Sequence, residues 1–232
     1  MTDHFAEIYQ NKAVQYEQMV SREDYQGNIP AAIRQVRDLA GLDVVDSGAG
    51  TGRLACLFAP QVRSMQAFDT SAAMLAVARQ RLQASGLANW RAELADHRSL
   101  PVPDASVDVI LSGWSVVYTV VWCPETWQAE LGKALAELRR VLRPGGTIII
   151  LETMGTGAEA PNPPPDLLPY FRYLEEQGFT PSWFRTDYKF ANMEEARELI
   201  SFFFGEEMMA KVQVGDSVIL PECTGLWWKT IA

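Results

Sequence analysis

The chain has 232 residues, a length typical of one large domain or of one domain that carries an insertion. Hydrophobic residues make up 48% of it and charged residues 21%, which excludes a disordered chain and is ordinary for a globular protein. Asp and Glu outnumber Lys and Arg by 29 to 20, so the net charge of −9 disfavours DNA or RNA as the main partner.

Short apolar runs alternate with helical patterns from residue 30 to residue 151. A helix is predicted over 30–39, where Gly41 ends it. The predicted strands are 43–46, 64–68, 89–94, 106–112 and 147–151. The helical patterns between them are 52–59, 71–85 and 125–142. This alternation predicts βαβ units, and therefore an α/β fold in which a doubly wound, mostly parallel sheet has helices on both faces.

The pattern changes after the fifth predicted strand. Pro and Gly are frequent over 154–169, which predicts an extended loop. The elements predicted after this loop are a helix ending at Gly178, a strand over 179–190, a helix over 192–205 and a strand over 217–231 that breaks near Pro221. These last two strands bring the predicted sheet to seven.

Cysteine usage indicates a reducing compartment. Cys56, Cys123 and Cys223 lie far apart and show no CxxC spacing, so we expect neither a disulfide framework nor a metal site. Residues 1–12 are polar, which predicts no secretory signal. The longest uncharged run, 109–123, is too short and too polar to span a bilayer. We therefore expect a cytoplasmic protein without a membrane span.

The strongest motif is a glycine turn in VVDSGAGTGRL, residues 44–54. A buried strand runs into Asp46, and the glycines that follow allow a tight turn with its backbone close to a ligand. The helix that follows at once offers unpaired N–H groups. The dinucleotide fingerprint needs Gly or Ala five residues after Gly48, where this chain has Arg53, and the GxxxxGK[ST] phosphate loop is absent. Asp46 would repel a phosphate and suits a cationic amine.

With this turn in place, the chain resembles the class I S-adenosylmethionine-dependent methyltransferases, and most of all the type 11 group that includes the ubiquinone and menaquinone biosynthesis enzymes. The resemblance runs from about Asp43 to Glu152 through four motifs in order: VVDSGAGTG, FDTSAAML (68–75), ELADHRSLPVPDASVDVILS (93–112) and LRRVLRPGGTIIILE (138–152). It implies a seven-stranded sheet whose last strand is antiparallel. It also implies S-adenosyl-L-methionine as cofactor, S-adenosyl-L-homocysteine as product, and methyl transfer to a small organic acceptor by in-line displacement.

The resemblance implies a domain plan as well. We expect one methyltransferase domain over 1–232, with N-terminal helices over 1–40, a cofactor-binding core over 41–152 and substrate-side elaborations over 153–232.

Residue roles follow from the same resemblance. Asp69, at the end of the second strand, would accept hydrogen bonds from both ribose hydroxyls. Asp96 would accept one from the adenine amine, with the His97 backbone beside the ring. Met74 would pack on the adenine. Asp46 and the backbone of the turn would hold the amine and carboxylate of the methionine part. The full set of expected cofactor-binding residues is Tyr16, Asp46, Ser47, Gly48, Ala49, Gly50, Gly52, Asp69, Thr70, Met74, Asp96, His97, Ser112, Gly113 and Trp114.

Tyr16 enters this set because the family often has an N-terminal tyrosine that closes over the cofactor. Tyr9 and Tyr16 are seven residues apart on one helical face, and a tyrosine ring could favour the sulfonium cation. Ordinary helix packing is the alternative for both.

No residue is assigned as a catalytic base, since a base is needed only if the acceptor must lose a proton. Tyr118 and Glu152 point toward the expected substrate side and are the candidates, as a base or as an orienting group; structural hydrogen bonding is the alternative for each. The aromatic residues in the segments expected around the acceptor suggest a small, partly apolar molecule. They are Trp114, Tyr118, Trp122, Tyr170, Phe171, Tyr173, Trp183 and Phe202.

Two other functions stay open: a cofactor-binding module or pseudoenzyme that acts through a partner protein, and, with less support, a nicotinamide oxidoreductase. As partners we expect a small-molecule acceptor and no nucleic acid, with a homodimer left open.

The helix over 192–205 is predicted to form part of a substrate lid. Its apolar face should dock on the domain and consists of Met193, Ala196, Leu199, Ile200, Phe203 and Phe204. Phe202 falls on the opposite face, as a candidate contact for the acceptor or for a second subunit.

Overall fold

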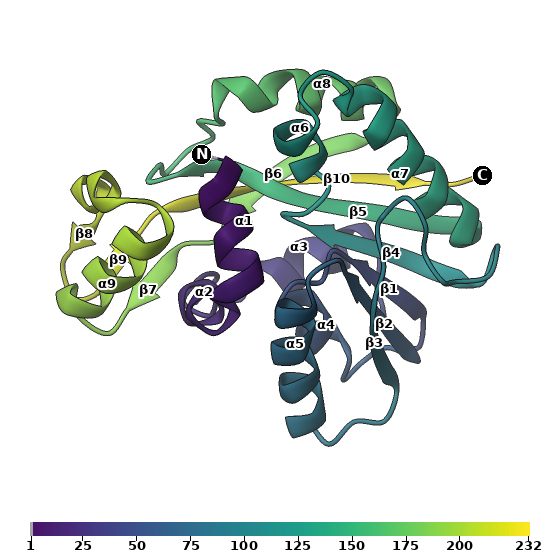
Figure 1. Ribbon diagram of the computed structural model, residues 1–232, viewed down its shortest axis with the longest axis horizontal. Helices are drawn as coiled ribbons and strands as arrows, with labels where there is room; N and C mark the ends of the chain where they lie inside the picture. The colour runs from purple at the N-terminus through teal and green to yellow at the C-terminus, as the bar shows by residue number, and fades with distance from the viewer. Residues whose placement is uncertain (1) are drawn as a thin grey trace.

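The computed structural model describes residues 2–232, with side chains from Phe5 onward, so residue 1 of the predicted N-terminal segment lies outside the described residues. A seven-stranded sheet in the order β3-β2-β1-β4-β5-β10-β6 runs through the molecule (Figure 1). Its strands are β1 (Asp43–Ser47), β2 (Ser64–Asp69), β3 (Trp90–Leu94), β4 (Val107–Gly113), β5 (Leu142–Thr156), β6 (Thr180–Arg185) and β10 (Glu222–Thr230).

Strand pairing confirms the predicted sheet. The first five strands pair in parallel, and β10, the last strand of the chain, is antiparallel to both β5 and β6. The central strands are covered on both faces. In β1, every residue after Asp43 is buried.

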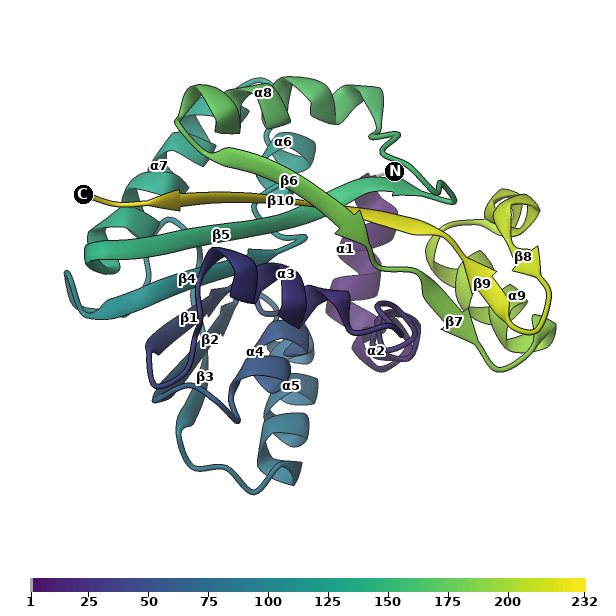
Figure 2. The same ribbon diagram turned by 180° about the vertical axis from the view of Figure 1, so that it is seen from behind.

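Helices cover both faces of this sheet (Figures 1 and 2). One face carries α3 (Asn28–Val36), α4 (Arg53–Phe58) and α5 (Ala72–Ala84), whose apolar side chains share a core with β1 and β2. The other carries α7 (Trp127–Val141) and α8 (Leu168–Glu176), which follows the short 3-10 turn η1 (Pro165–Leu167). This is the Rossmann-like arrangement that the alternating pattern predicted.

Three helices lie around the carboxyl edge of the sheet. The N-terminal helices α1 (Thr2–Asn11) and α2 (Ala13–Val20) pack against α5. Helix α6 (Tyr118–Trp122) follows β4 and was not predicted, because its five residues are too few to show a helical period. Between residues 2 and 232, no helix combines the length and the apolar character needed to cross a membrane.

The segment between β6 and β10 forms a small lobe at one side of the molecule (left in Figure 1). It contains β7 (Tyr188–Phe190), α9 (Met193–Phe203), the 3-10 segment η2 (Glu206–Lys211), β8 (Gln213–Val214) and β9 (Val218–Leu220). The predicted strand over 179–190 is therefore two strands in different sheets, since β7 pairs with β9 and not with β10. The break near Pro221 is confirmed: this residue separates β9 from β10.

Helix α9 keeps only part of its predicted pattern. The Asn192 side chain accepts a hydrogen bond from the Glu195 N–H at 2.9 Å and so caps the start of the helix. Burial of Met193 was wrongly predicted: it is the first residue of the helix, at the end of its packed face, and it is 39% exposed. Phe202 is half-buried, with the Lys12 ammonium 5.9 Å from its ring centroid.

Candidate active site

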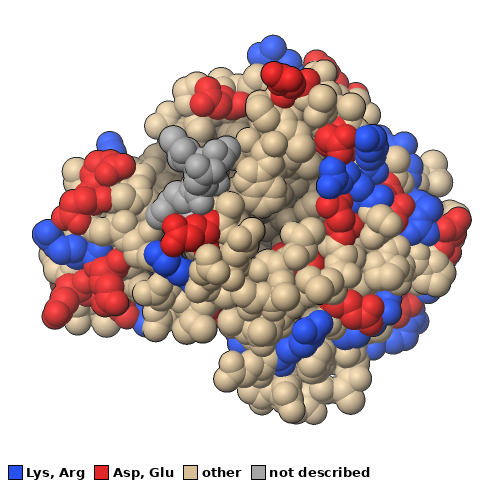
Figure 3. Space-filling view, in the orientation of Figure 1, with Lys and Arg blue, Asp and Glu red and all other residues tan. Residues whose placement is uncertain are grey.

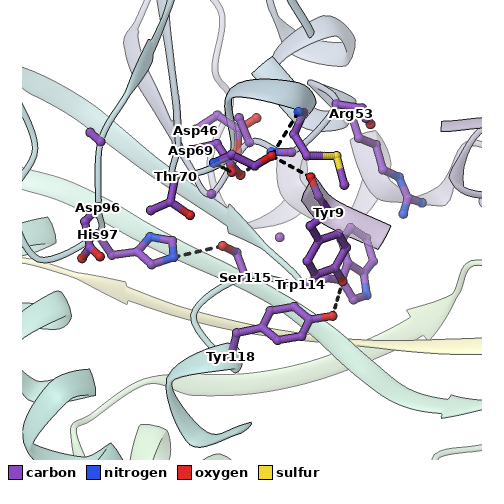
Figure 4. Close-up of a pocket in the computed structure, with 18 of the residues that line it drawn as sticks. Tyr9, Asp46, Arg53, Asp69, Thr70, Asp96, His97, Trp114, Ser115 and Tyr118 are labelled. Atoms are coloured by element: carbon purple, nitrogen blue, oxygen red, sulfur yellow. Dashed lines mark hydrogen bonds between the residues drawn. The ribbon is translucent and has the colours of Figure 1, made fainter. Parts of the chain in front are cut away.

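A cavity opens at the carboxyl ends of β1, β2 and β4, where doubly wound sheets bind ligands. Figure 3 shows the hollow in this face of the molecule, and Figure 4 shows the residues that line it. Its walls come from the glycine turn, from the loops after β2, β3 and β4, and from α1, α2 and α6.

Each glycine of the turn has its own function. All three have positive φ, and a Cβ on Gly48 would lie 1.6 Å from the Ser115 hydroxyl, so only glycine lets the turn approach the loop after β4. A Cβ on Gly50 would meet nothing within 4 Å, which leaves this position facing open space. Gly52 lies outside the cavity, and a Cβ added to it would lie 3.0 Å from the Ala78 Cβ, so glycine here lets α4 pack close to α5.

Asp69 closes the turn from the neighbouring strand. Its Oδ2 accepts a hydrogen bond from the Gly50 N–H and its Oδ1 one from the Ser71 N–H, each at 2.8 Å. Burial raises the pKa of this carboxyl. Each oxygen has a second lone pair, so the fixed carboxylate can accept two further hydrogen bonds from a ligand.

Asp46 lies at the base of the turn and is 1% exposed. Its Oδ2 accepts a hydrogen bond from the Ala55 N–H of α4 at 2.9 Å. Burial, and secondarily the charge of Asp69, raises the pKa of Asp46 to about 7. A cation bound next to it would favour the ionised form.

The loop after β3 supplies the far end of the cavity (left in Figure 4). Asp96 is bound by the Arg98 guanidinium at 2.7 Å from each of its two oxygens, which lowers the pKa of the acid. The His97 ring bridges the Ser47 hydroxyl at 2.7 Å and the Ser115 hydroxyl at 3.0 Å. Burial lowers the pKa of His97 to about 4, so the ring is neutral and joins the end of β1 to the loop after β4.

Arg53 and Trp114 lie at the opposite end from Asp96 (Figure 4). The guanidinium carbon of Arg53 is 4.3 Å from the centroid of the Trp114 ring, and Nη1 donates to Glu23 at 2.6 Å. Nη2 is buried and finds no hydrogen-bond partner within the described part of the chain. Trp114 itself adopts φ 49°, an uncommon conformation for a bulky residue that aims the loop after β4 toward Arg53.

Aromatic side chains form the remaining wall. The Tyr9 hydroxyl of α1 hydrogen-bonds the Tyr118 hydroxyl of α6, so the two helices meet across the cavity. The Ser71 hydroxyl donates to the Tyr9 carbonyl at 2.6 Å and fixes α1 to the loop after β2. The Tyr16 ring lies edge-on to Tyr9, with centroids 5.5 Å apart. Burial raises the pKa of Tyr118 to about 12.

The structure brings most of the predicted cofactor residues together around this cavity. Those that line it are Tyr16, Asp46, Gly48, Ala49, Gly50, Asp69, Thr70, Met74, Asp96, His97, Gly113 and Trp114. Three predicted residues do not: Ser47 holds His97, Gly52 packs on Ala78, and Ser112 is buried within β4.

The two catalytic candidates are placed differently. Tyr118 lines the cavity, whereas Glu152 does not. Glu152 is 1% exposed, and its Oε1 accepts hydrogen bonds from the Val117 N–H at 3.2 Å and the Tyr170 hydroxyl at 3.0 Å. Burial raises the pKa of Glu152 to about 8. The carboxyl group therefore fixes the loop that leads into α6.

Several lining residues were missed from the sequence. They are Thr51, Arg53, Leu54, Ser71, Ala95, Arg98, Ser115, Thr119 and Cys123. Arg53 had a usable signal, because it opens the helix directly after the glycine turn. Thr119 had none, because the helix that contains it was not predicted. Of the aromatic residues expected around the acceptor, Tyr170, Phe171, Tyr173, Trp183 and Phe202 do not line the cavity.

Comparison with known proteins identifies similar sequences and structures. Residues 45–150 match the family model of a methyltransferase domain. The chain is 36% identical over 118 residues to a malonyl-[acyl-carrier protein] O-methyltransferase of Serratia marcescens, covering 51% of this chain and 40% of that one. It is 33% identical over 120 residues to a ubiquinone/menaquinone biosynthesis C-methyltransferase of Rubrivivax gelatinosus, covering 52% and 43%. These matches span less than half the length of either relative.

Solved structures share the fold. The YcgJ protein of Bacillus subtilis has a TM-score of 0.58 at 18% identity, over 89% of this chain and 99% of its own. An S-adenosylmethionine-dependent methyltransferase of Aquifex aeolicus has a TM-score of 0.54 at 19% identity, over 88% and 89%. Residues 45–150 therefore match a methyltransferase domain, and the sheet that contains them has the fold of a solved S-adenosylmethionine-dependent methyltransferase.

Proposed function

We propose that the whole chain is an enzyme that transfers the methyl group of S-adenosylmethionine to a small organic acceptor. The observation that carries this proposal is the placement of Asp46, Asp69 and Asp96 at the ends of consecutive strands along one cavity wall. An amine, a ribose diol and an adenine amine are the three donor groups of the cofactor, and they occur in that order along it.

The cofactor contacts are also a proposal. Asp69 receives the ribose hydroxyls, Asp46 the methionine amine and Asp96 the adenine amine, while Met74 packs on the adenine. The space beside Gly50 admits the ligand next to the backbone. To the predicted set we add Arg53, whose unpaired Nη2 at the other end of the cavity suits the methionine carboxylate.

When bound, the cofactor supplies a methyl group that is already activated as a sulfonium. The protein then needs mainly to align the acceptor and exclude water. The contact of Tyr9 with Tyr118 closes the cavity between α1 and α6, and His97 with Ser115 holds the loop after β4 against the glycine turn.

The proposal also covers the domain organisation of the chain, its partner and its cellular compartment. We treat 1–232 as one methyltransferase unit in which the lobe between β6 and β10 is a substrate-side elaboration. Its partner is a small molecule rather than a nucleic acid. Three free cysteines fit the cytoplasm. The pseudoenzyme and oxidoreductase alternatives gain no support from the site.

Calorimetry and turnover test the function together. S-adenosylhomocysteine should bind the full chain with micromolar affinity, and NADH should not bind. Release of S-adenosylhomocysteine from S-adenosylmethionine across an acceptor library should identify substrates. Binding of NADH in place of S-adenosylhomocysteine would contradict the proposal, and binding without any turnover would favour the pseudoenzyme.

A further inference from the structure

Arg53, the proposed partner of the methionine carboxylate, is held by two contacts. Its Nη1 donates to the Glu23 Oε2 at 2.6 Å, and its guanidinium carbon lies 4.3 Å from the centroid of the Trp114 ring. No other acid in the described part of the chain pairs with this arginine. Because an arginine side chain has many rotamers, these two contacts decide where the buried and unpaired Nη2 points.

Glu23 lies outside the cavity, in the connector between α2 and α3 that spans residues 21–27. Its side chain is only 3% exposed, so the arginine balances a carboxylate that water does not reach. Its acidic neighbour is Glu222, at the start of β10. Burial, and secondarily the charge of Glu23, raises the pKa of Glu222 and so favours its neutral form. Glu23 therefore supplies the negative charge that faces Arg53.

The lobe between β6 and β10 holds the connector on both sides of Glu23. The Arg22 guanidinium donates to the Glu195 Oε1 of α9, at 2.6 Å from Nη2 and 3.1 Å from Nε. The carbonyl of Arg22 also accepts a hydrogen bond from a backbone N–H of β7 at 2.9 Å. On the other side, the Asp24 N–H donates to the Thr186 carbonyl at 3.2 Å. The lobe lies beside α2, where the connector begins (Figures 1 and 2).

Asp24 also fixes the connector to α3. It adopts φ 58°, a conformation that is uncommon outside glycine but that Asp tolerates better than most residues. Its two carboxylate oxygens accept hydrogen bonds from the Asn28 N–H at 2.7 Å and the Ile29 N–H at 2.9 Å, at the start of the helix. The backbone that carries Glu23 is therefore held by the lobe and by α3, and it leaves the carboxylate little freedom to move.

From these contacts we infer that Glu23 is a positioning residue of the cofactor site: it holds Arg53 so that Nη2 faces the methionine carboxylate, and the lobe fixes Glu23 through the connector. The inference rests on the proposed function and deepens it. It gives the lobe a part in cofactor binding in addition to its place on the substrate side.

Two conservative substitutions separate the position of Glu23 from its charge. Glu23→Gln keeps an oxygen in place for Nη1 and removes the charge, whereas Glu23→Asp keeps the charge and withdraws it from Arg53. By calorimetry, S-adenosylhomocysteine affinity should stay within about threefold of wild type in Glu23→Gln and fall about tenfold in Glu23→Asp, the loss of one charge-assisted hydrogen bond. The decarboxylated analogue should bind wild type and both variants alike, because it lacks the group that Arg53 holds.

A double-mutant cycle tests whether Glu23 acts through Arg53. In an Arg53→Met background, Glu23→Asp should change S-adenosylhomocysteine affinity by less than about twofold, because the group that it positions is gone. Glu137→Asp is the matched control: Glu137 of α7 pairs with Arg140 at 2.7 Å and lies outside the cavity, so it should leave both ligands unaffected.

Arg22→Met tests the part of the lobe. It removes both hydrogen bonds to Glu195 and leaves Glu23 and Arg53 unchanged. We expect S-adenosylhomocysteine affinity to fall about threefold, the size of a partly exposed ion pair, while the affinity of the decarboxylated analogue stays as in wild type. Unchanged affinity for S-adenosylhomocysteine would overturn the part assigned to the lobe.

The outcomes separate the inference from the proposed function. A loss in Glu23→Gln with none in Glu23→Asp would show that Glu23 acts only as a counter-charge. Equal losses for S-adenosylhomocysteine and its decarboxylated analogue, together with a lower melting temperature, would show a role in the fold alone. Either result would overturn the positioning role, whereas failure of the wild type to bind S-adenosylhomocysteine would overturn the proposed function itself.

Discussion

Asp69 offers the sharpest test of the cofactor site. If its carboxylate holds the ribose, Asp69→Asn replaces one acceptor oxygen with an NH₂ group. Both oxygens already accept a backbone N–H at 2.8 Å, from Gly50 and Ser71, so the new donor must face one of these donors or the ribose. A hydrogen bond to a charged group contributes about 1.5–3 kcal/mol, so S-adenosylhomocysteine affinity should fall roughly 10- to 150-fold.

A second ligand measures the contribution of the ribose hydroxyls to binding. Calorimetry with the 2′,3′-dideoxy analogue of S-adenosylhomocysteine should show weak binding to wild type and little further loss in Asp69→Asn. Thermal denaturation checks the fold, because the variant also disturbs the turn. If both ligands lose affinity equally, Asp69 serves only the backbone and the ribose assignment is wrong.

Three further predictions concern the proposed cofactor site. Gly50→Val should abolish S-adenosylhomocysteine binding, measured by calorimetry, because a side chain there enters the space left for the ligand and φ 52° disfavours a β-branched residue. Asp46 has a pKa of about 7 in the free protein, and a bound amine needs its ionised form; affinity should therefore rise as pH goes from 6 to 8, with proton release, and Asp46→Asn should remove this dependence. Arg53→Met should weaken S-adenosylhomocysteine binding about tenfold but leave its decarboxylated analogue unaffected, whereas Arg197→Met, an arginine of α9 paired with Glu206 outside the cavity, should affect neither.

The sheet was predictable because its signals are local. Short apolar runs and the glycine turn after the first strand can be recognised from neighbouring residues. So can helical patterns that last 13 and 15 residues, as in α5 and α7. The same turn placed Asp46, Asp69 and Asp96 at one edge, since the carboxyl ends of parallel strands share it. The strand over 179–190 was misjudged because its sequence reads as one continuous strand. Arg185 pairs with β10 and Tyr188 with β9, so the division into two sheets is set by partners far along the chain.

The contact between α1 and α6 was not predictable for a related reason. Tyr9 and Tyr118 meet across 109 positions of sequence, and a helix of five residues gives no period to detect. Trp183 and Phe202 were grouped with the acceptor residues by type alone, yet Trp183 lies on β6 and Phe202 beside Lys12. Residue type indicates what a side chain can do, whereas tertiary contacts decide where it does so.

A Glu152 variant tests whether this buried acid acts on the acceptor or only stabilises the fold. Its pKa of about 8 lies above the usual range of a glutamic acid, so the folded state binds a proton that the unfolded state releases above about pH 4.5. The stability that this proton contributes is complete at low pH and is lost as the pH rises toward 8. Glu152→Gln mimics the neutral acid and keeps an oxygen for the Val117 N–H and the Tyr170 hydroxyl. Urea denaturation should therefore show equal stability at pH 5 and a growing advantage of the variant above it, by at most about 1.4 kcal/mol per pH unit, with kcat retained. Loss of kcat in a stable variant that still binds S-adenosylhomocysteine would instead make Glu152 a group that acts on the acceptor.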